Sequence, residues 1–350
     1  MRGLPILLAR AIYGISWFFL SPYLPYLVPQ NMVELVPFSF FATAAIMQIP
    51  AGIISTRLGM KRTYSLGLII MGLSDALIGF TRNPYLILFL YSLTGFGASF
   101  FFSSAGGTLA VINEGRITTV MGLYNAMFSV GGIIGLNWGF LDELLGFTYA
   151  SAMLGIMTLS MGLINLFYGY SNVRPDFRVI KDKRVSVIAL LTAGVWGSFY
   201  VVSEYFPSFS YYFFKESSIN VSSISSVLLF SSFIGGLASR LAENRVKQLV
   251  TLICFLGVIP VLALYTSLYY VGLVVMGVFN EMAISLIYSL AVNYSRSVNS
   301  SVSLALVNAI QIGVGMTELL IPVLVGYFTW FIVALVSSLP LIGLLSVLKR

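Results

Sequence analysis

Four ionisable side chains interrupt long apolar runs of this sequence: Arg10, Glu204, Glu281 and Glu318. Placing a charged group at the centre of a bilayer costs about 2.5–3.5 kcal/mol, so such a group usually faces protein or water. A buried carboxyl avoids this cost by binding a proton, which it can release when water reaches it. If these runs cross a membrane, the four residues could bind protons or contact a polar solute.

Polar and aromatic residues share helical faces with these charged groups. At 100° per residue, Asn308, Gln311 and Glu318 fall within an arc of about 80°. Lipid does not tolerate such a polar stripe, so it should face a cavity. The other residues predicted to line that cavity are Tyr13 and Trp17 beside Arg10, Tyr200 beside Glu204, and Tyr288 beside Glu281.

Each charged residue also has a simpler interpretation. Arg10 lies about 9 Å from the inner end of its segment, so its side chain could extend to the interface. Glu204 could lie at the level of the outer headgroups. Glu281 and Glu318 could serve only as structural hydrogen-bonding groups.

The composition excludes a water-soluble protein. Of 350 residues, 58% are hydrophobic and 9% are charged, whereas soluble domains carry about 25% charged residues. Apolar runs of about 20 residues recur along the whole chain, as in transmembrane helices, and they do not alternate like barrel strands. About twelve spans are predicted, at 5–28, 35–57, 64–81, 85–112, 118–140, 146–170, 186–213, 220–242, 247–266, 269–294, 301–326 and 328–347.

The distribution of cations predicts the orientation. Of the 19 lysines and arginines, Arg10 lies within a span, and Arg82 and Lys215 fall on one side; the other sixteen lie at the termini or in the loops on the opposite side. Because positive loops resist translocation, both termini are expected in the cytoplasm. The net charge of +7 therefore reports topology and indicates no nucleic-acid partner.

The two halves of the chain repeat each other. Matching positions lie 183 residues apart, namely Gly52 and Gly235, Arg57 and Arg240, and Leu123-x-Asn125-Ala126 and Leu306-x-Asn308-Ala309. The repeat predicts two six-helix bundles in parallel orientation, residues 1–170 and 186–350, joined by a charged cytoplasmic linker at 171–185.

The stretch from residue 52 to residue 62 reads GIISTRLGMKR. It resembles the signature of the major facilitator superfamily, G-x-L-a-D-R-x-G-R-K, which joins spans 2 and 3. The matching positions are Gly52, Arg57, Gly59 and Lys61, and Arg62 adds a cation; Thr56 stands where the family has aspartate, and Ser239 stands at the repeated position. A generic positively charged loop is the alternative interpretation.

The resemblance covers nearly the whole chain and implies an all-α fold of two pseudo-symmetric six-helix bundles. It also implies a secondary transporter that moves a small solute across the cytoplasmic membrane by rocker-switch alternating access. The substrate site would lie between the halves near mid-membrane, and the loops containing Arg57 and Arg240 would hold the cytoplasmic side closed. Coupling to protons through Glu281 and Glu318 is the predicted mechanism. Asp75 is a further acid in span 3, which is usually scaffold in this family, so it ranks lower for substrate contact.

Other classes have less support. The sequence has no histidine, a single cysteine, Cys254, and no phosphate-binding G-x-x-x-x-G-K-[ST] motif. No enzyme activity, cofactor or metal is therefore expected, and the expected partners are a small solute, lipid and protons, with the chain acting as a monomer. A sensor or binding protein that does not cycle, and an uncoupled facilitator, remain alternatives.

Overall fold

The computed structural model describes residues 2–29, 32, 35–176, 183–215, 218–295 and 297–348. Within these ranges every regular element is a helix and no strand occurs, which confirms the all-α prediction. Residues 177–182 of the predicted linker lie outside the described residues, as do five cations that contributed to the predicted orientation: Arg178, Lys181, Arg296, Lys349 and Arg350.

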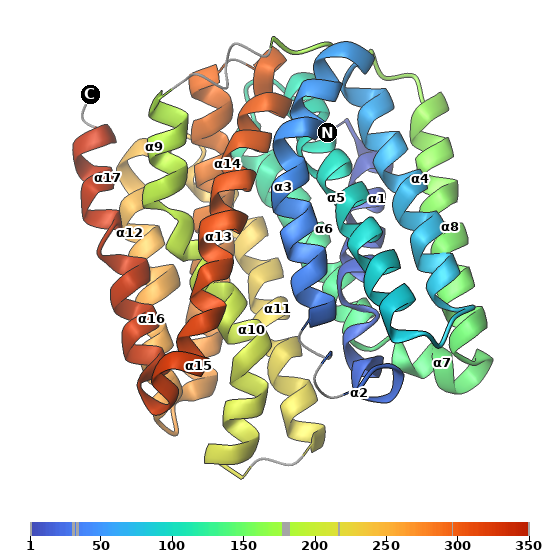
Figure 1. The fold of residues 1–350 in the computed structure, drawn as a ribbon. Helices are drawn as coiled ribbons and strands as arrows, with labels where there is room; N and C mark the ends of the chain where they lie inside the picture. Colours follow the sequence, from blue (N-terminus) through green and yellow to red (C-terminus); the bar gives the residue numbers. More distant parts are fainter. Residues whose placement is uncertain are drawn as a thin grey trace. The chain divides into compact units, whose positions relative to one another are not determined.

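Among the described residues, nine helical elements lie in the first half of the chain, and Figure 1 labels the α-helices among them. They are α1 (Leu4–Phe18), η1 (Ser21–Tyr23), α2 (Leu24–Leu27), α3 (Leu35–Leu58), α4 (Met60–Ile78), α5 (Pro84–Ile112), α6 (Ile117–Leu136), α7 (Gly139–Leu145) and α8 (Phe147–Phe167). The predicted first span, 5–28, is not continuous, because the sequence has prolines at 22 and 25 that interrupt helical hydrogen bonding.

The second half is more segmented. It comprises α9 (Lys183–Leu191), α10 (Ala193–Phe213), α11 (Ser218–Ala238), η4 (Ser239–Ala242), α12 (Val246–Val258), η5 (Ile259–Tyr265), α13 (Tyr269–Ser295), η6 (Ser297–Asn299), α14 (Ser300–Gly315), η7 (Met316–Leu320), α15 (Ile321–Val325), η8 (Gly326–Phe328), α16 (Thr329–Ser338) and α17 (Leu341–Leu348). The predicted span 301–326 is thus an α-helix that tightens to a 3₁₀ turn at Met316.

Nine helical segments among the described residues are long and apolar enough to cross a membrane. Leu4–Phe18 and Ser226–Ala242 are shorter apolar helices, and α4 is a 19-residue helix that contains Lys61, Arg62 and Asp75. Together these segments account for the twelve predicted spans. Large apolar side chains such as Phe89 and Ile156 are exposed, as lipid-facing side chains are.

The chain forms two compact units. Unit 1 contains Met1–Glu114, Met127–Lys181 and Ser295–Ala309, and unit 2 contains Gly115–Ala126, Asp182–Tyr294 and Ile310–Arg350. Each unit thus holds most of one sequence half together with the first turns of one helix, α14 or α6, from the other half. The simpler division at residues 171–185 stays a prediction.

In unit 1, α4 packs between α5 and α8 (Figure 1). The absence of a side chain at glycine lets these helices approach closely. A Cβ at Gly72, for example, would come only 2.7 Å from the carbonyl oxygen of Gly155 on α8. Helix α5 begins at Pro84, and the Asn83 side chain accepts hydrogen bonds from the backbone N–H groups of Tyr85 and Leu86, which is a standard N-cap. In unit 2, α10 packs against α11, η7 and α16.

Candidate functional site

Arg10 lies in an aromatic cage in unit 1. Its guanidinium carbon is 4.4, 4.6 and 4.8 Å from the ring centroids of Tyr13, Phe128 and Phe102, and the residue is only 2% exposed. Cation–π attraction is strongest at such desolvated positions. The side chain therefore does not extend to the interface.

The predicted neighbours of Arg10 are part of the same cluster. Tyr13 and Trp17 are both buried, and their ring centroids lie 5.6 Å apart. Trp17 also makes an edge-to-face contact with Phe128 at 5.3 Å. The cage combines residues of α1, α5 and α6, which sequence spacing along α1 could not reveal.

Glu318 lies in η7, within unit 2, and is buried. The Ser337 hydroxyl on α16 donates a hydrogen bond to Glu318 Oε2 at 2.7 Å. On its other side the carboxyl packs against the backbone of α10, where a Cβ at Gly197 would come 2.5 Å from Glu318 Oε1. A side chain at position 197 would therefore require the carboxyl of Glu318 to shift.

The polar stripe predicted on span 301–326 divides between the two units. Asn308 belongs to unit 1, whereas Gln311 and Glu318 belong to unit 2, and all three are buried. Gln311 Nε2 donates to Thr192 Oγ1 at 2.8 Å. The tighter 3₁₀ winding also turns Glu318 by about 60° from its place on a continuous α-helix, since a 3₁₀-helix advances about 120° per residue.

Glu281 and Tyr288 are buried on α13 in unit 2. The Ser285 hydroxyl donates to the Glu281 carbonyl oxygen at 2.9 Å and accepts from Asn125 Nδ2 at 3.2 Å. Tyr288 accepts a hydrogen bond from Trp196 Nε1 at 3.2 Å. Tyr200 extends this cluster, with its ring centroid 5.2 Å from that of Trp196.

Glu204 differs from the other acids of the predicted spans because its side chain is exposed. It lies on α10, two turns beyond Gly197. An exposed carboxylate on an apolar helix is compatible with both a water-filled mouth and the headgroup level.

Asp75 is fully buried on α4 in unit 1. Its Oδ1 accepts a hydrogen bond from Thr94 Oγ1 on α5 at 3.0 Å, and the Ser16 hydroxyl on α1 also interacts with the carboxyl. This group lies within the helix packing of unit 1.

The signature loop between α3 and α4 is built on backbone contacts. Gly59 has a φ of 85°, a conformation that favours glycine. Asn172 Nδ2 donates to the Leu58 carbonyl oxygen at 2.8 Å, and Asn172 Oδ1 accepts from Lys61 N–H at 3.1 Å. Lys61 Nζ donates to the Tyr168 carbonyl oxygen at 2.9 Å. The signature residues thus tie the start of the linker to unit 1, with Gly52 buried and Arg57 and Arg62 exposed.

Unit 1 contains the contact between the start of α14 and helices α3 and α5, called here the α14 contact. It consists of Ser297, Ser300 and Ser301 packed on Ser55, Ser104, Gly107 and Glu114. Ser301 Oγ bonds to Ser55 Oγ at 3.0 Å and to Ser104 Oγ at 3.3 Å. Ser300 Oγ donates to the Gly107 carbonyl at 3.0 Å, and Ser297 Oγ donates to Glu114 Oε1 at 2.8 Å.

Unit 2 contains the corresponding α6 contact, in which Thr118, Thr119 and Gly122 pack on Gly236, Ser239, Glu243 and Ser289. Thr118 Oγ1 bonds to Ser289 Oγ at 2.7 Å, and Ser239 Oγ donates to the Thr118 carbonyl at 3.3 Å. The Glu243 carboxylate caps α6: it accepts from Thr118 N–H at 3.0 Å and from Thr119 N–H and Oγ1, each at 2.6 Å. An acid at a helix N-terminus satisfies unpaired N–H groups and complements the helix dipole.

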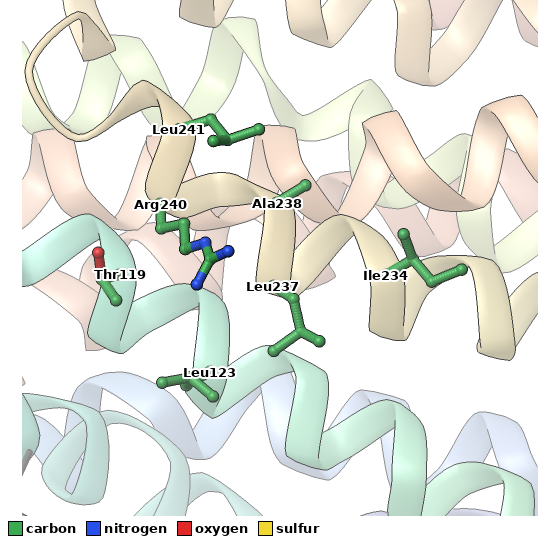
Figure 2. Close-up of a pocket in the computed structure, with 7 residues that line it drawn as sticks. All are labelled: Thr119, Leu123, Ile234, Leu237, Ala238, Arg240 and Leu241. Atoms are coloured by element: carbon green, nitrogen blue, oxygen red, sulfur yellow. The ribbon is translucent and has the colours of Figure 1, made fainter.

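A pocket of about 400 Å³ lies beside the α6 contact. Its lining residues are Thr119, Leu123, Ile234, Leu237, Ala238, Arg240 and Leu241, all in unit 2. Figure 2 shows the Arg240 side chain extending from η4 into the space between Thr119 and Leu237. The pocket is apolar apart from this cation and Thr119, and it contains none of the predicted acids.

Sequence reasoning missed Asn172 and Glu243. Both are side chains in loops that satisfy the backbone at the end of a distant helix. The sequence predicts only that the carbonyl groups at the end of α3 need partners from outside the helix. It contains no local pattern that identifies which side chain supplies the hydrogen bond.

The comparisons with known proteins agree with this architecture. The family model described as Major Facilitator Superfamily matches residues 6–317. The chain belongs to this superfamily. Its fold is similar to that of the human organic anion transporter MFSD10 (TETRAN), with a TM-score of 0.79 over 97% of this chain and 98% of the other, at 14% sequence identity. A search of curated proteins finds no match.

Membership of the Major Facilitator Superfamily makes this chain a multi-pass membrane protein of a transporter family, with a small-molecule solute as substrate. The predicted family and helical fold are therefore confirmed. The family points to transport and away from enzyme activity.

Proposed function

We propose that this chain is a secondary active transporter that moves a small solute across the cytoplasmic membrane by rocker-switch alternating access, with Glu281 and Glu318 binding the coupling protons. The observation that carries the proposal is Glu318. It is a buried carboxyl in a 3₁₀ turn that interrupts a membrane-spanning helix. Such turns within helices often mark hinges.

The surroundings of Glu318 suit a group that changes protonation. Its hydrogen bond comes from a neutral hydroxyl, Ser337 Oγ, and its other face lies against the Gly197 backbone. An ionised carboxylate there would require strong compensation for its lost hydration. Protonation removes that requirement, and a shift of η7 against α10 would let water reach the carboxyl and take the proton.

Two helices are suited to transmit such a movement. Helix α6 begins in unit 2 and ends in unit 1, whereas α14 begins in unit 1 and ends in unit 2. Breaking the polar bonds at the α6 and α14 contacts would free both helix starts. We propose that these contacts close the cytoplasmic end, with the signature residues Gly52, Arg57, Gly59, Lys61, Arg62 and Arg240 supporting the loops beside them.

The solute would meet the aromatic and amide side chains of α1, α10, α13 and α14. The proposed lining is Arg10, Tyr13, Trp17, Tyr200, Glu204, Tyr288, Asn308 and Gln311, with Glu281 and Glu318. With its acids ionised, this set suits a cationic or amphipathic solute. With the acids protonated, Arg10 supplies the net charge and an organic anion fits, which is the class named for the structural neighbour.

The test has two stages. A thermal-shift screen of the purified protein against a solute library identifies a ligand, and proteoliposomes then measure its uptake with and without a pH gradient. Uptake should follow the gradient, and Glu281→Gln and Glu318→Gln should each uncouple it, with Glu143→Gln as an exposed control. Uptake that ignores the gradient would establish an uncoupled facilitator, and ligand binding without flux would establish a non-cycling sensor.

A further inference from the structure

Asp75 is the one acid of the predicted spans to which the proposed transport mechanism assigns no role. Asp75, Ser16 and Thr94 are each fully buried, and they come from α4, α1 and α5. Thr94 Oγ1 satisfies Asp75 Oδ1 at 3.0 Å. Asp75 Oδ2 and Ser16 Oγ both lack a hydrogen bond of standard geometry, although the hydroxyl interacts with the carboxyl.

Among the residues that the structure describes, no cation pairs with this carboxyl. Helices α5 and α8 carry no charged residue. The charged residue of α1 is Arg10, and its guanidinium packs on three aromatic rings. The charged residue of α3 is Arg57, which is exposed. The buried phenol on α5, Tyr91, donates to the Trp17 carbonyl. An ionised Asp75 would therefore be a buried charge without a counter-ion, which proteins avoid.

We infer that Asp75 is a proton-binding site, in which the carboxyl holds a proton on Oδ2 directed at Ser16 Oγ while Oδ1 accepts from Thr94. A proton there satisfies both orphaned atoms, Asp75 Oδ2 as donor and Ser16 Oγ as acceptor. The side chains of Asp75, Ser16 and Thr94 offer four oxygens at this point, fewer than the six or more that Ca²⁺ or Mg²⁺ coordinates. The site lies outside the residues proposed to contact solute.

The position of the site links it to α1. Ser16 precedes Trp17, and the backbone oxygen of Trp17 accepts the Tyr91 hydroxyl, so α1 is joined to α4 and α5 by neighbouring polar contacts. Release of the proton requires water to reach Asp75, and this requires α1 to separate from α4 and α5. On the proposed function, proton exchange at Asp75 would then accompany the movement of α1 during transport.

Infrared spectroscopy tests the site without any transport assay, so its outcome is independent of the proposed function. Protein labelled with ¹³C at the aspartate carboxyl is measured in an ester-free detergent at a pH of about 8, where exposed carboxyls are ionised. We expect the C=O band of a neutral carboxylic acid, shifted by the label. The band should vanish in Asp75→Asn and change frequency in Ser16→Ala and Thr94→Val.

Two further variants keep the result decisive. Burial raises the pKa of Asp142, which lies in α7 outside the spans, so Asp142→Asn is the control that must retain the band. The triple variant D142N/D176N/D182N leaves Asp75 as the sole aspartate of the sequence, and hence as the sole labelled side-chain carboxyl. It must also retain the band, which decides the question even if Asp75→Asn does not fold. Absence of the labelled band in the wild type and the triple variant, or its loss when sodium replaces choline at constant pH, would overturn the assignment.

Discussion

The α6 contact and the α14 contact occupy equivalent places in the two halves, yet they are held differently. Thr118 and Ser301, 183 positions apart, each bond to a hydroxyl on a long neighbouring helix. Only the α6 contact places a carboxylate on the backbone N–H groups of the helix start. The position equivalent to Glu243 is Met60, so the repeat has kept the hydroxyl bonds and changed the cap. One contact has a charged cap, whereas the other is held mainly by neutral serines. Both are closely packed, since a Cβ at Gly107 would come 2.7 Å from Ser301 N.

The largest expected difference lies between two glycines, Gly122 in the α6 contact and Gly52 on α3, which precedes Ser55 of the α14 contact by three residues. A Cβ at Gly122 would meet the Gly236 carbonyl oxygen and Ser239 Oγ, whereas a Cβ at Gly52 would meet Ala305 Cβ at 3.2 Å. We expect Gly122→Ala to lower the free energy of unfolding by about 3 kcal/mol, because backbone cannot move aside cheaply, and Gly52→Ala by about 1 kcal/mol at most. Thermal unfolding in detergent measures both, with Gly313→Ala, which has open space around it, as the control. Equal losses would show that the two glycine positions are packed equally well.

Removing the charged cap should have the next largest effect. Glu243→Ala leaves two N–H groups and one hydroxyl without their acceptor, for an expected cost of about 2 kcal/mol. Labelling of a cysteine at position 123 should also rise, measured in a Cys254→Ser background; Cys254 itself is fully buried. Glu143→Ala, an exposed acid, should change neither quantity. Unchanged labelling in Glu243→Ala would remove the cap from the proposed closure.

The neutral bonds should contribute equally in the two contacts. Thr118→Val and Ser301→Ala each remove hydroxyl bonds, and each should cost about 1 kcal/mol. Chemical or thermal unfolding of the two variants decides this directly. A cost for Ser301→Ala as large as that for Glu243→Ala would mean that the serine contact compensates for its missing carboxylate.

The smallest effects are expected at the exposed signature arginines. Arg57 is exposed, and the described part of the chain contains no hydrogen bond or ion pair to it. Arg57→Ala and Arg240→Ala should change the free energy of unfolding by no more than about 0.5 kcal/mol, with a rise in cysteine labelling smaller than that from Glu243→Ala. If Arg57→Ala raises cysteine labelling more than Glu243→Ala does, the signature loop would contribute more to closure than the α6 contact.

Hydropathy predicted the helical class and the number of spans, because lipid imposes length and apolarity on every span. The signature-like stretch at 52–62 and the internal repeat predicted the family. They could not predict the cage around Arg10, since Phe102 and Phe128 come from other helices. The helical wheel located the stripe on 301–326 but not the 3₁₀ turn that rotates Glu318. Glu243 and Asn172 depend on which helix ends approach their loops, a tertiary property with no local pattern.

The start of the linker has a mechanical consequence. Met60 N–H donates to the Val173 carbonyl, and Asp176 N–H donates to Asn299 Oδ1, so the chain is anchored up to residue 176, and α9 begins at Lys183. Seven peptide steps join these two fixed points, and a fully extended chain covers at most about 3.6 Å per step. Whatever conformations the protein adopts with this anchor intact, residues 176 and 183 can never be more than about 25 Å apart. The peptide between them thus sets an upper limit on how far these two points can separate in any conformational change.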